Sequence, residues 1–233
     1  IDLKNNKINI ATHEKEDYRE ELCDTIERLF NYKVTEKKER YIIINSRKLC
    51  NLFIKIGLSG NANTKKVPNW VFALPRNQII SFLAGYFDSD GHSVENAIAF
   101  TSISKQLLEQ IKTIGISVGF GVSKIFRHGN AGKVKILGIE CNAKDSWRIL
   151  FNGKNIKELP ARCERKRNLI KKIKTVRSYV SARGLNFRSK TNDEVGFTRI
   201  DKIASLGIKP TFDIEVENYH NFIANGLIVH NSG

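Results

Sequence analysis

The C-terminal end of this sequence carries residue types that could break a peptide bond. His230, Asn231 and Ser232 are adjacent, and His220 precedes them in the same stretch. The Asn231 side-chain amide can attack its own backbone carbonyl and close a five-membered succinimide, which breaks the bond to Ser232. Imidazoles transfer protons near neutral pH, and a serine hydroxyl can accept an acyl group as an ester.

A longer stretch around these residues resembles the final two motifs of an intein. It comprises Thr211 to Val216 and Tyr219 to Ser232, and Asn225-Gly226 within it is a strong hairpin signal. The resemblance implies protein splicing, a reaction for which we expect no cofactor.

The intein resemblance also implies a role for each polar residue of the stretch. Asn231 cyclises, His230 polarises the scissile carbonyl or protonates the leaving amine, and His220 acts nearby as an acid or base. Ser232 accepts the upstream flanking segment as an ester, which rearranges to a peptide bond after cyclisation. Asp213 matches an acid that assists earlier steps. We therefore expect these five residues to be catalytic.

A second candidate for chemistry is the segment 83–91, Leu-Ala-Gly-Tyr-Phe-Asp-Ser-Asp-Gly. Its small residues Ala84 and Gly85 would let two such helices pack backbone to backbone, so that carboxylates at the helix ends meet. Paired carboxylates hold divalent ions that activate water for attack on a phosphodiester. The segment resembles the signature of LAGLIDADG homing endonucleases, which implies Mg²⁺-dependent, site-specific cleavage of double-stranded DNA.

The LAGLIDADG resemblance implies roles for further residues. Asp90 corresponds to the catalytic, metal-binding acid of the helix, whereas Asp88 serves mainly the helix end. Lys65 and Lys157, each three residues before a proline, match the catalytic basic residues that flank the active centre. The sequence contains one such motif, so we expect the partner helix to come from an N-terminal fragment.

Two segments about ninety residues apart share an order of predicted elements: strand, helix, two strands, short helix, then the lysine before a proline. The first copy is predicted to contain Ile8–Thr12, Tyr18–Phe30, Tyr32–Val34, Tyr41–Ile44 and Leu49–Ile56. The second copy is predicted to contain Ala97–Thr101, Leu107–Ile114, Val122–Phe126, Val134–Ile139 and Trp147–Phe151.

These patterns predict an α+β protein with αββαββα repeats of the endonuclease type, the first incomplete, followed by the last strands of an all-β splicing (Hint) domain. The three terminal strands are predicted at Phe197–Ile203, Thr211–Val216 and Asn221–Val229. The predicted segments are the remainder of the first repeat (1–75), the second repeat (76–160), a basic linker (161–192), the terminal splicing segment (193–231) and the start of the flanking host sequence (232–233).

Positive charge is concentrated in one part of the chain. The net charge is +15, and residues 161–190, here called the basic segment, carry eleven Lys or Arg against one Glu. A polyanion such as DNA fits this charge, because each neutralised phosphate releases counterions; a solvated basic face with no ligand is the alternative. The residues expected to contact DNA are Arg162, Arg165, Lys166, Arg167, Lys171, Lys172, Lys174 and Arg177.

The sequence thus predicts an enzyme with two linked activities, protein splicing and DNA cleavage. The expected partners are double-stranded DNA, an N-terminal intein fragment with the first nucleophile and first LAGLIDADG helix, and the flanking host (extein) protein. We expect no membrane partner and a cytoplasmic location, because no apolar run reaches about 18 residues. The alternative is a DNA- or RNA-binding module that has lost nuclease activity and retained splicing only.

Overall fold

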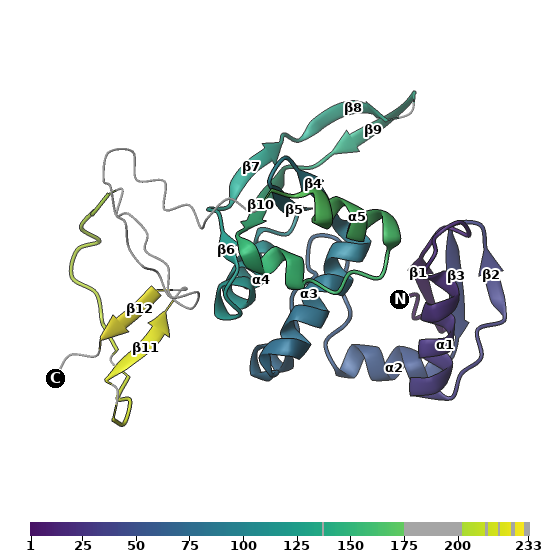
Figure 1. The fold of residues 1–233 in the computed structure, drawn as a ribbon, viewed down its shortest axis with the longest axis horizontal. Helices are drawn as coiled ribbons and strands as arrows, with labels where there is room; N and C mark the ends of the chain where they lie inside the picture. The colour runs from purple at the N-terminus through teal and green to yellow at the C-terminus, as the bar shows by residue number, and fades with distance from the viewer. Residues whose placement is uncertain (137, 175–201, 213, 219, 225–226, 231–233) are drawn as a thin grey trace.

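The computed structural model describes residues 1–136, 138–174, 202–212, 214–218, 220–224 and 227–230. These residues form several antiparallel sheets with helices between them (Figure 1). The mixed α and β content agrees with the predicted class. In the described residues, no helix combines the length and the apolar character that a membrane crossing requires.

The N-terminal unit is a three-stranded sheet with two helices, and its strands follow the order β1-β3-β2. Its elements are β1 (Lys7–Ala11), α1 (Arg19–Phe30), β2 (Glu36–Lys38), β3 (Tyr41–Asn45) and α2 (Arg47–Lys55). The β-branched run of β3 suits a buried strand, and Ile42 and Ile44 are fully buried. Ser46 caps α2, because its side chain accepts a hydrogen bond from the Leu49 backbone at 3.3 Å.

The second unit contains a five-stranded sheet in the order β4-β5-β10-β6, with β7 also paired to β10. Its helices are η1 (Asn69–Ala73), α3 (Arg76–Asp90), α4 (Lys105–Ser117), η2 (Lys154–Glu158) and α5 (Glu164–Lys172). Its sheet strands are β4 (Gly91–Val94), β5 (Ala97–Ser102), β6 (Gly121–Val122), β7 (Phe126–Gly129) and β10 (Ser146–Asn152).

The two units share their strand order. In the first, β3 lies between β1 and β2; in the second, β10 lies between β5 and β6, and every pairing is antiparallel. In each unit a helix follows the first of these strands, α1 in one and α4 in the other. This shared order depends on β10, which the sequence analysis predicted as a helix, so it differs from the repeat that was expected.

Aromatic packing fixes α3 against the sheet of the second unit. Phe87 of α3, Phe100 of β5 and Phe151 of β10 are fully buried, with ring centroids 6.3 and 5.2 Å apart along this series. A Cβ atom at Gly91 would lie 2.2 Å from the Phe87 ring. Glycine therefore lets the chain turn from α3 into β4 over this core.

Four element predictions in the two units were wrong in detail. Val122–Phe126, predicted as one strand, contains the end of β6 and the start of β7, and residues 123–125 between them are not strand. Trp147–Phe151, predicted as a helix, lies in strand β10, because Ile149 and Phe151 alternate into the core and the run is too short for a stable helix. Val134–Ile139 spans parts of two strands, β8 (Gly132–Ile136) and β9 (Ile139–Ala143), which pair as a hairpin. The strand predicted at Tyr32–Val34 is not present there. The structure has β2 at Glu36–Lys38 instead, which ends just before the turn at residues 39–40.

The C-terminal part forms the predicted hairpin, β11 (Asn221–Ala224) with β12 (Leu227–His230). The described residues of Thr211–Val216 contain no strand, contrary to the prediction. Apolar side chains here and just before this range are little covered within the described part of the chain: Phe212 is 94% exposed and Ile208 is fully exposed. Of the predicted strand Phe197–Ile203, residues 197–201 lie outside the described residues.

Candidate functional site

The C-terminal hairpin brings His220 and His230 together. The register of β11 and β12 pairs Asn221 with His230, and His220 is the residue immediately before Asn221. His220 has a positive φ of 52°, and its backbone N–H donates to the Val216 carbonyl at 3.2 Å. The two imidazole rings have centroids 6.2 Å apart. Two groups suited to proton transfer thus lie side by side at the end of β12.

The other predicted splicing residues, Asp213, Asn231 and Ser232, lie outside the described residues. Their roles stay predictions. His230, at the end of β12, directly precedes Asn231, the residue expected to cyclise. The hairpin therefore brings His220 close to the residue before Asn231.

The end of α3 carries the predicted metal-binding acid beside a lysine. Lys65 Nζ donates to Asp90 Oδ2 at 3.1 Å, and both side chains are partly exposed. The Lys65 backbone is held too, because its carbonyl accepts from Ser104 Oγ at 3.1 Å. Two predicted site residues, 25 positions apart in the sequence, therefore meet at the end of α3.

The expected Mg²⁺ site needs two carboxylates, one from each of two helices. Asp90 would supply one of them. Among the described residues, the group of three or more candidate metal ligands lies elsewhere, at Glu16, Asp17 and Cys163. Lys157 is exposed on η2, and the described structure gives it no hydrogen bond or ion pair with Asp90. The Mg²⁺ site and the catalytic role of Lys157 stay predictions.

The ends of α3 and α5 cap each other. The Asp88 carboxylate accepts hydrogen bonds from the backbone N–H groups of Arg162 at 2.7 Å and Cys163 at 3.3 Å, just before α5 begins. Lys166 of α5 donates through Nζ to the carbonyls of Phe87 and Asp88, both at 2.6 Å. Burial raises the pKa of Asp88, and the two backbone bonds oppose that shift. The terminal groups that each helix leaves unpaired thus find partners on the other helix.

Lys166 is buried, unlike the other lysines of the basic segment that the structure describes. Its side chain is 4% exposed, and burial lowers the pKa of its ammonium group. Its Nζ also lies 5.4 Å from the centroid of the Phe87 ring. Contact between Lys166 and DNA stays a prediction, and in this structure its ammonium group already has acceptors.

Three arginines that we expected at DNA lie against acidic side chains of the N-terminal unit. Arg165 is 3.8 Å from Glu16, Arg167 is 3.6 Å from Asp17, and Arg162 pairs with Glu21. All three ion pairs are at least partly exposed to solvent, so each contributes little to stability alone. Lys171, Lys172 and Lys174 are exposed, and within the described residues they form no ion pair with an acidic side chain. Arg177 lies outside the described residues.

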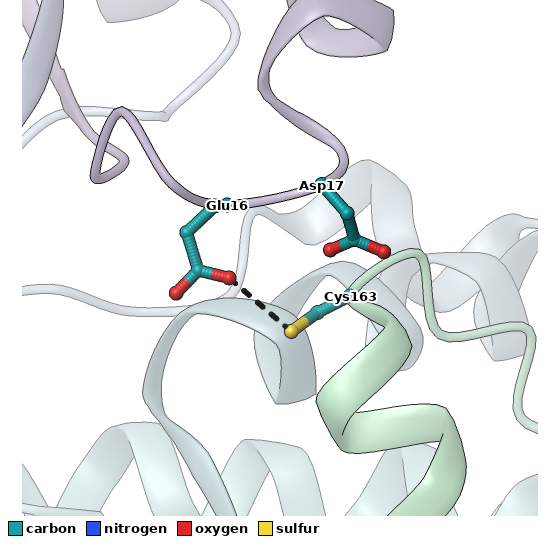
Figure 2. Close-up of side chains that lie close together, drawn as sticks. All are labelled: Glu16, Asp17 and Cys163. Atoms are coloured by element: carbon teal, nitrogen blue, oxygen red, sulfur yellow. Dashed lines mark hydrogen bonds between the residues drawn. The ribbon is translucent and has the colours of Figure 1, made fainter.

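Glu16, Asp17 and Cys163 form a cluster that the sequence analysis did not anticipate (Figure 2). The Cys163 thiol donates to Glu16 Oε2 at 3.4 Å, and the Glu164 backbone N–H donates to Asp17 at 2.8 Å. Burial raises the pKa of the Cys163 thiol. These contacts dock the segment before α1 onto the start of α5. The excess of acids in residues 14–21, opposite in sign to the basic segment, was the signal that could have found it.

A cationic cluster lies on the sheet of the second unit, on the face opposite the aromatic core. Arg148 is directly opposite Thr101 in the pairing of β10 with β5, and its Nε donates to Thr101 Oγ1 at 3.0 Å. Arg148 Nη2 is 2.6 Å from Nε2 of His128. His92 lies on the same face, because it is opposite Ala99, two residues before Thr101. Burial lowers the pKa of His92, and the Arg148 charge lowers it further.

A comparison with protein-family models matches residues 2–231 to the intein splicing domain. The match therefore covers both mixed units and the C-terminal hairpin. It includes His220 and His230, which the hairpin brings together, and it ends at Asn231.

Similar stretches occur in proteins of unrelated names. The chain is 32% identical over 199 residues to an iron-sulfur cluster assembly SufBD family protein of Mycobacterium leprae, a match that covers 82% of the chain and 22% of that protein. It is 28% identical over 210 residues to a DNA polymerase of Thermococcus sp. (strain GE8), covering 84% of the chain and 11% of the polymerase. It is 26% identical over 239 residues to a tRNA-splicing ligase RtcB of Pyrococcus horikoshii, covering 97% of the chain and 26% of the ligase. The chain thus spans about a quarter or less of each relative.

Proposed function

The chain belongs to the intein splicing domain family, and we propose that its C-terminal end performs the last cleavage of protein splicing through Asn231. Membership of this family implies autocatalytic protein splicing. The observation that carries the proposal for this end is the pair His220 and His230, 6.2 Å apart on the hairpin that leads to Asn231.

The proposed step balances within the chain itself. The Asn231 side-chain nitrogen attacks the Asn231 carbonyl carbon, the bond to the Ser232 nitrogen breaks, and a succinimide remains on Asn231. The leaving amine needs one proton and the attacking amide loses one. Two neighbouring imidazoles can supply and accept these protons near neutral pH, which supports roles for His220 and His230.

The distribution of the relatives supports a segment carried inside host proteins. An iron-sulfur cluster assembly protein, a DNA polymerase and a tRNA-splicing ligase share no activity in their names, yet each matches this chain over a minor part of its length. A segment that inserts into unrelated hosts and excises itself from the translated product accounts for this pattern. We therefore propose that the chain acts between flanking segments of such a host.

Exposed apolar residues support a partner for the terminal segment. The described residues between 203 and 214 leave five large apolar side chains at least half exposed, namely Ile203, Leu206, Ile208, Phe212 and Ile214. Apolar surface of this extent favours association. We propose that strands from the N-terminal part of a splicing domain cover it.

The splicing proposal is tested on the full chain extended by a short reporter after Gly233, with release followed by intact mass. Asn231→Ala should abolish release, because it removes the attacking amide. His230→Ala should slow release by about two to four powers of ten, the contribution of a positioned acid or base. Ser232→Ala is the matched control: it removes the ester-forming hydroxyl but leaves cyclisation intact. Release from Asn231→Ala at the unmodified rate would contradict the proposal.

A second function, cleavage of duplex DNA, is favoured by the surface of α3. The helix exposes Ser81, Gly85 and Ser89 at intervals of four residues, and a Cβ atom at Gly85 would meet nothing within 4 Å. Such a row of small residues lets another helix approach closely. The row ends beside Asp90 and Lys65, so a second helix packed there could add its own carboxylate to that of Asp90. A bound Mg²⁺ ion would supply an activated water at that place.

The shared strand order of the two units also supports the nuclease proposal, because a duplicated unit offers two similar surfaces to the two halves of a DNA site. Asp90→Asn should abolish metal-dependent cleavage by the protein reconstituted with an N-terminal fragment, and splicing should continue. If the reconstituted wild-type protein binds DNA and splices but never cleaves, the alternative of a nuclease-decayed DNA- or RNA-binding module holds instead.

A further inference from the structure

Arg148 is a guanidinium group fixed in place without a counter-ion. It sits on β10, between its pairing partners β5 and β7, and Thr101 Oγ1 and His128 Nε2 hold it at 3.0 and 2.6 Å. No carboxylate lies within ion-pair distance of it among the residues that the structure describes. Burial lowers its pKa, and no acidic group opposes this shift. The positive charge of Arg148 is thus unbalanced on this face.

The neighbouring arginine on this sheet differs in this respect. Arg127 of β7 pairs with Asp145, which also accepts a hydrogen bond from the Ala131 backbone N–H at 2.7 Å. The charge of Arg127 is therefore matched inside the protein. The described groups that contact or neighbour Arg148 are Thr101, His128 and His92, and none of them carries a negative charge that could neutralise it.

We infer that Arg148, with His128 and His92 beside it, forms a subsite for one phosphate group of a nucleic-acid backbone. The two intramolecular bonds use Nε–H and one N–H of Nη2, so the remaining three N–H donors of the guanidinium are available. A guanidinium with parallel donors suits phosphate oxygens, and prior fixation reduces the entropy lost on binding.

The place of this subsite relates it to the proposed cleavage centre. His92 follows Asp90 by two residues at the turn from α3 into β4, and Arg148 lies across β5 from it. A duplex bound at Asp90 could therefore also place a phosphate at Arg148. The inference rests on the proposed DNA-cleaving role of this unit, and it names a residue that positions the strand beside the carboxylate.

The test compares Arg148→Gln with Arg127→Gln in the full chain, with a 30-base-pair duplex as the probe and fluorescence anisotropy as the readout over a range of salt. Each variant removes one positive charge from neighbouring strands of one sheet. Arg148→Gln should weaken binding about tenfold and reduce the slope of log affinity against log salt by about one. Arg127→Gln should change affinity less than about threefold. Equal losses in the two variants would overturn the inference, because they would report general charge only.

Two further measurements keep the result independent of folding and of the proposed function. Arg148→Lys, which keeps the charge but not the planar fork, should retain the salt slope and lose affinity. Titration of the wild-type protein with pyrophosphate should shift the Arg148 Nε–H resonance in a saturable way. If neither the wild-type chain nor the protein reconstituted with an N-terminal fragment binds duplex, the DNA-cleavage proposal fails, and this titration decides the subsite alone: a saturable shift supports it, and an unmoved resonance overturns it.

Discussion

Replacement of Lys166 by methionine should destabilise the second unit strongly, because this residue closes the end of α3. Methionine keeps the length and apolar stem of lysine but removes the donors. Two bonds at 2.6 Å to the carbonyls of Phe87 and Asp88 would be lost, each of the kind that contributes about 1.5–3 kcal/mol when one partner is charged. The change also ends the desolvation cost of a buried ammonium group. We therefore expect a net loss of about 2–4 kcal/mol, below the sum of the two bonds.

The assay is urea unfolding followed by circular dichroism, with hydrogen exchange of the peptide that contains Gly91 as a local probe. Lys172→Met is the matched control, because Lys172 is an exposed lysine of the same helix, and its replacement should cost less than about 0.5 kcal/mol. Faster exchange at the end of α3 should accompany the loss of stability in Lys166→Met. Equal stability of the two variants would refute the argument that the buried ammonium group holds this helix end.

Three other outcomes are expected. Gly115→Ala places a Cβ atom 2.4 Å from the Phe151 ring and should lower the free energy of unfolding by about 1–3 kcal/mol, measured by thermal unfolding. Gly85→Ala adds a Cβ atom in open space, so it should stabilise the isolated chain by up to about 1 kcal/mol. The same change should weaken assembly with a partner helix. The hydrogen bond from Arg127 holds the pKa of Asp145 below its ordinary value of 3.8. The stability that this carboxylate contributes is therefore present above pH 3.8 and is lost as the pH falls through the lowered pKa. Asp145→Asn should remove that part of the acid unfolding profile. Duplex binding by the full chain should fall about a thousandfold between about 50 and 200 mM salt if about six phosphates are contacted, and indifference to salt would exclude DNA as the partner of the basic segment.

Features set by neighbours in the sequence were predictable. The Asn225-Gly226 pair with its apolar flanks predicted the hairpin that the structure has, and the LAGLIDADG resemblance of segment 83–91 predicted a helix, which spans Arg76–Asp90. The LAGLIDADG resemblance assigned Lys65 and Asp90 to one centre, but it did not predict the hydrogen bond between them.

Features set by distant contacts were not predictable in the same way. The Arg162–Glu21 pair joins residues 141 positions apart, and no local pattern indicates which acid faces which arginine. The burial of Lys166 depends on how α5 meets α3, so composition alone placed it among solvent-facing cations. The Arg148 cluster depends on the correct assignment of β10 as a strand, since a helix would have placed Arg148 and Thr101 without a common face.

The central claim is that this chain completes protein splicing at its C-terminal end, and ligation tests it most directly. The chain, extended by a reporter after Gly233, is mixed with an N-terminal splicing-domain fragment that carries its own upstream reporter, and the products are identified by intact mass. The account predicts one product in which the two reporters are joined by a peptide bond, together with a released chain that ends in a succinimide at Asn231. If the N-terminal fragment binds and its upstream junction is activated, yet no joined product forms and the Asn231–Ser232 bond stays intact, the account is contradicted.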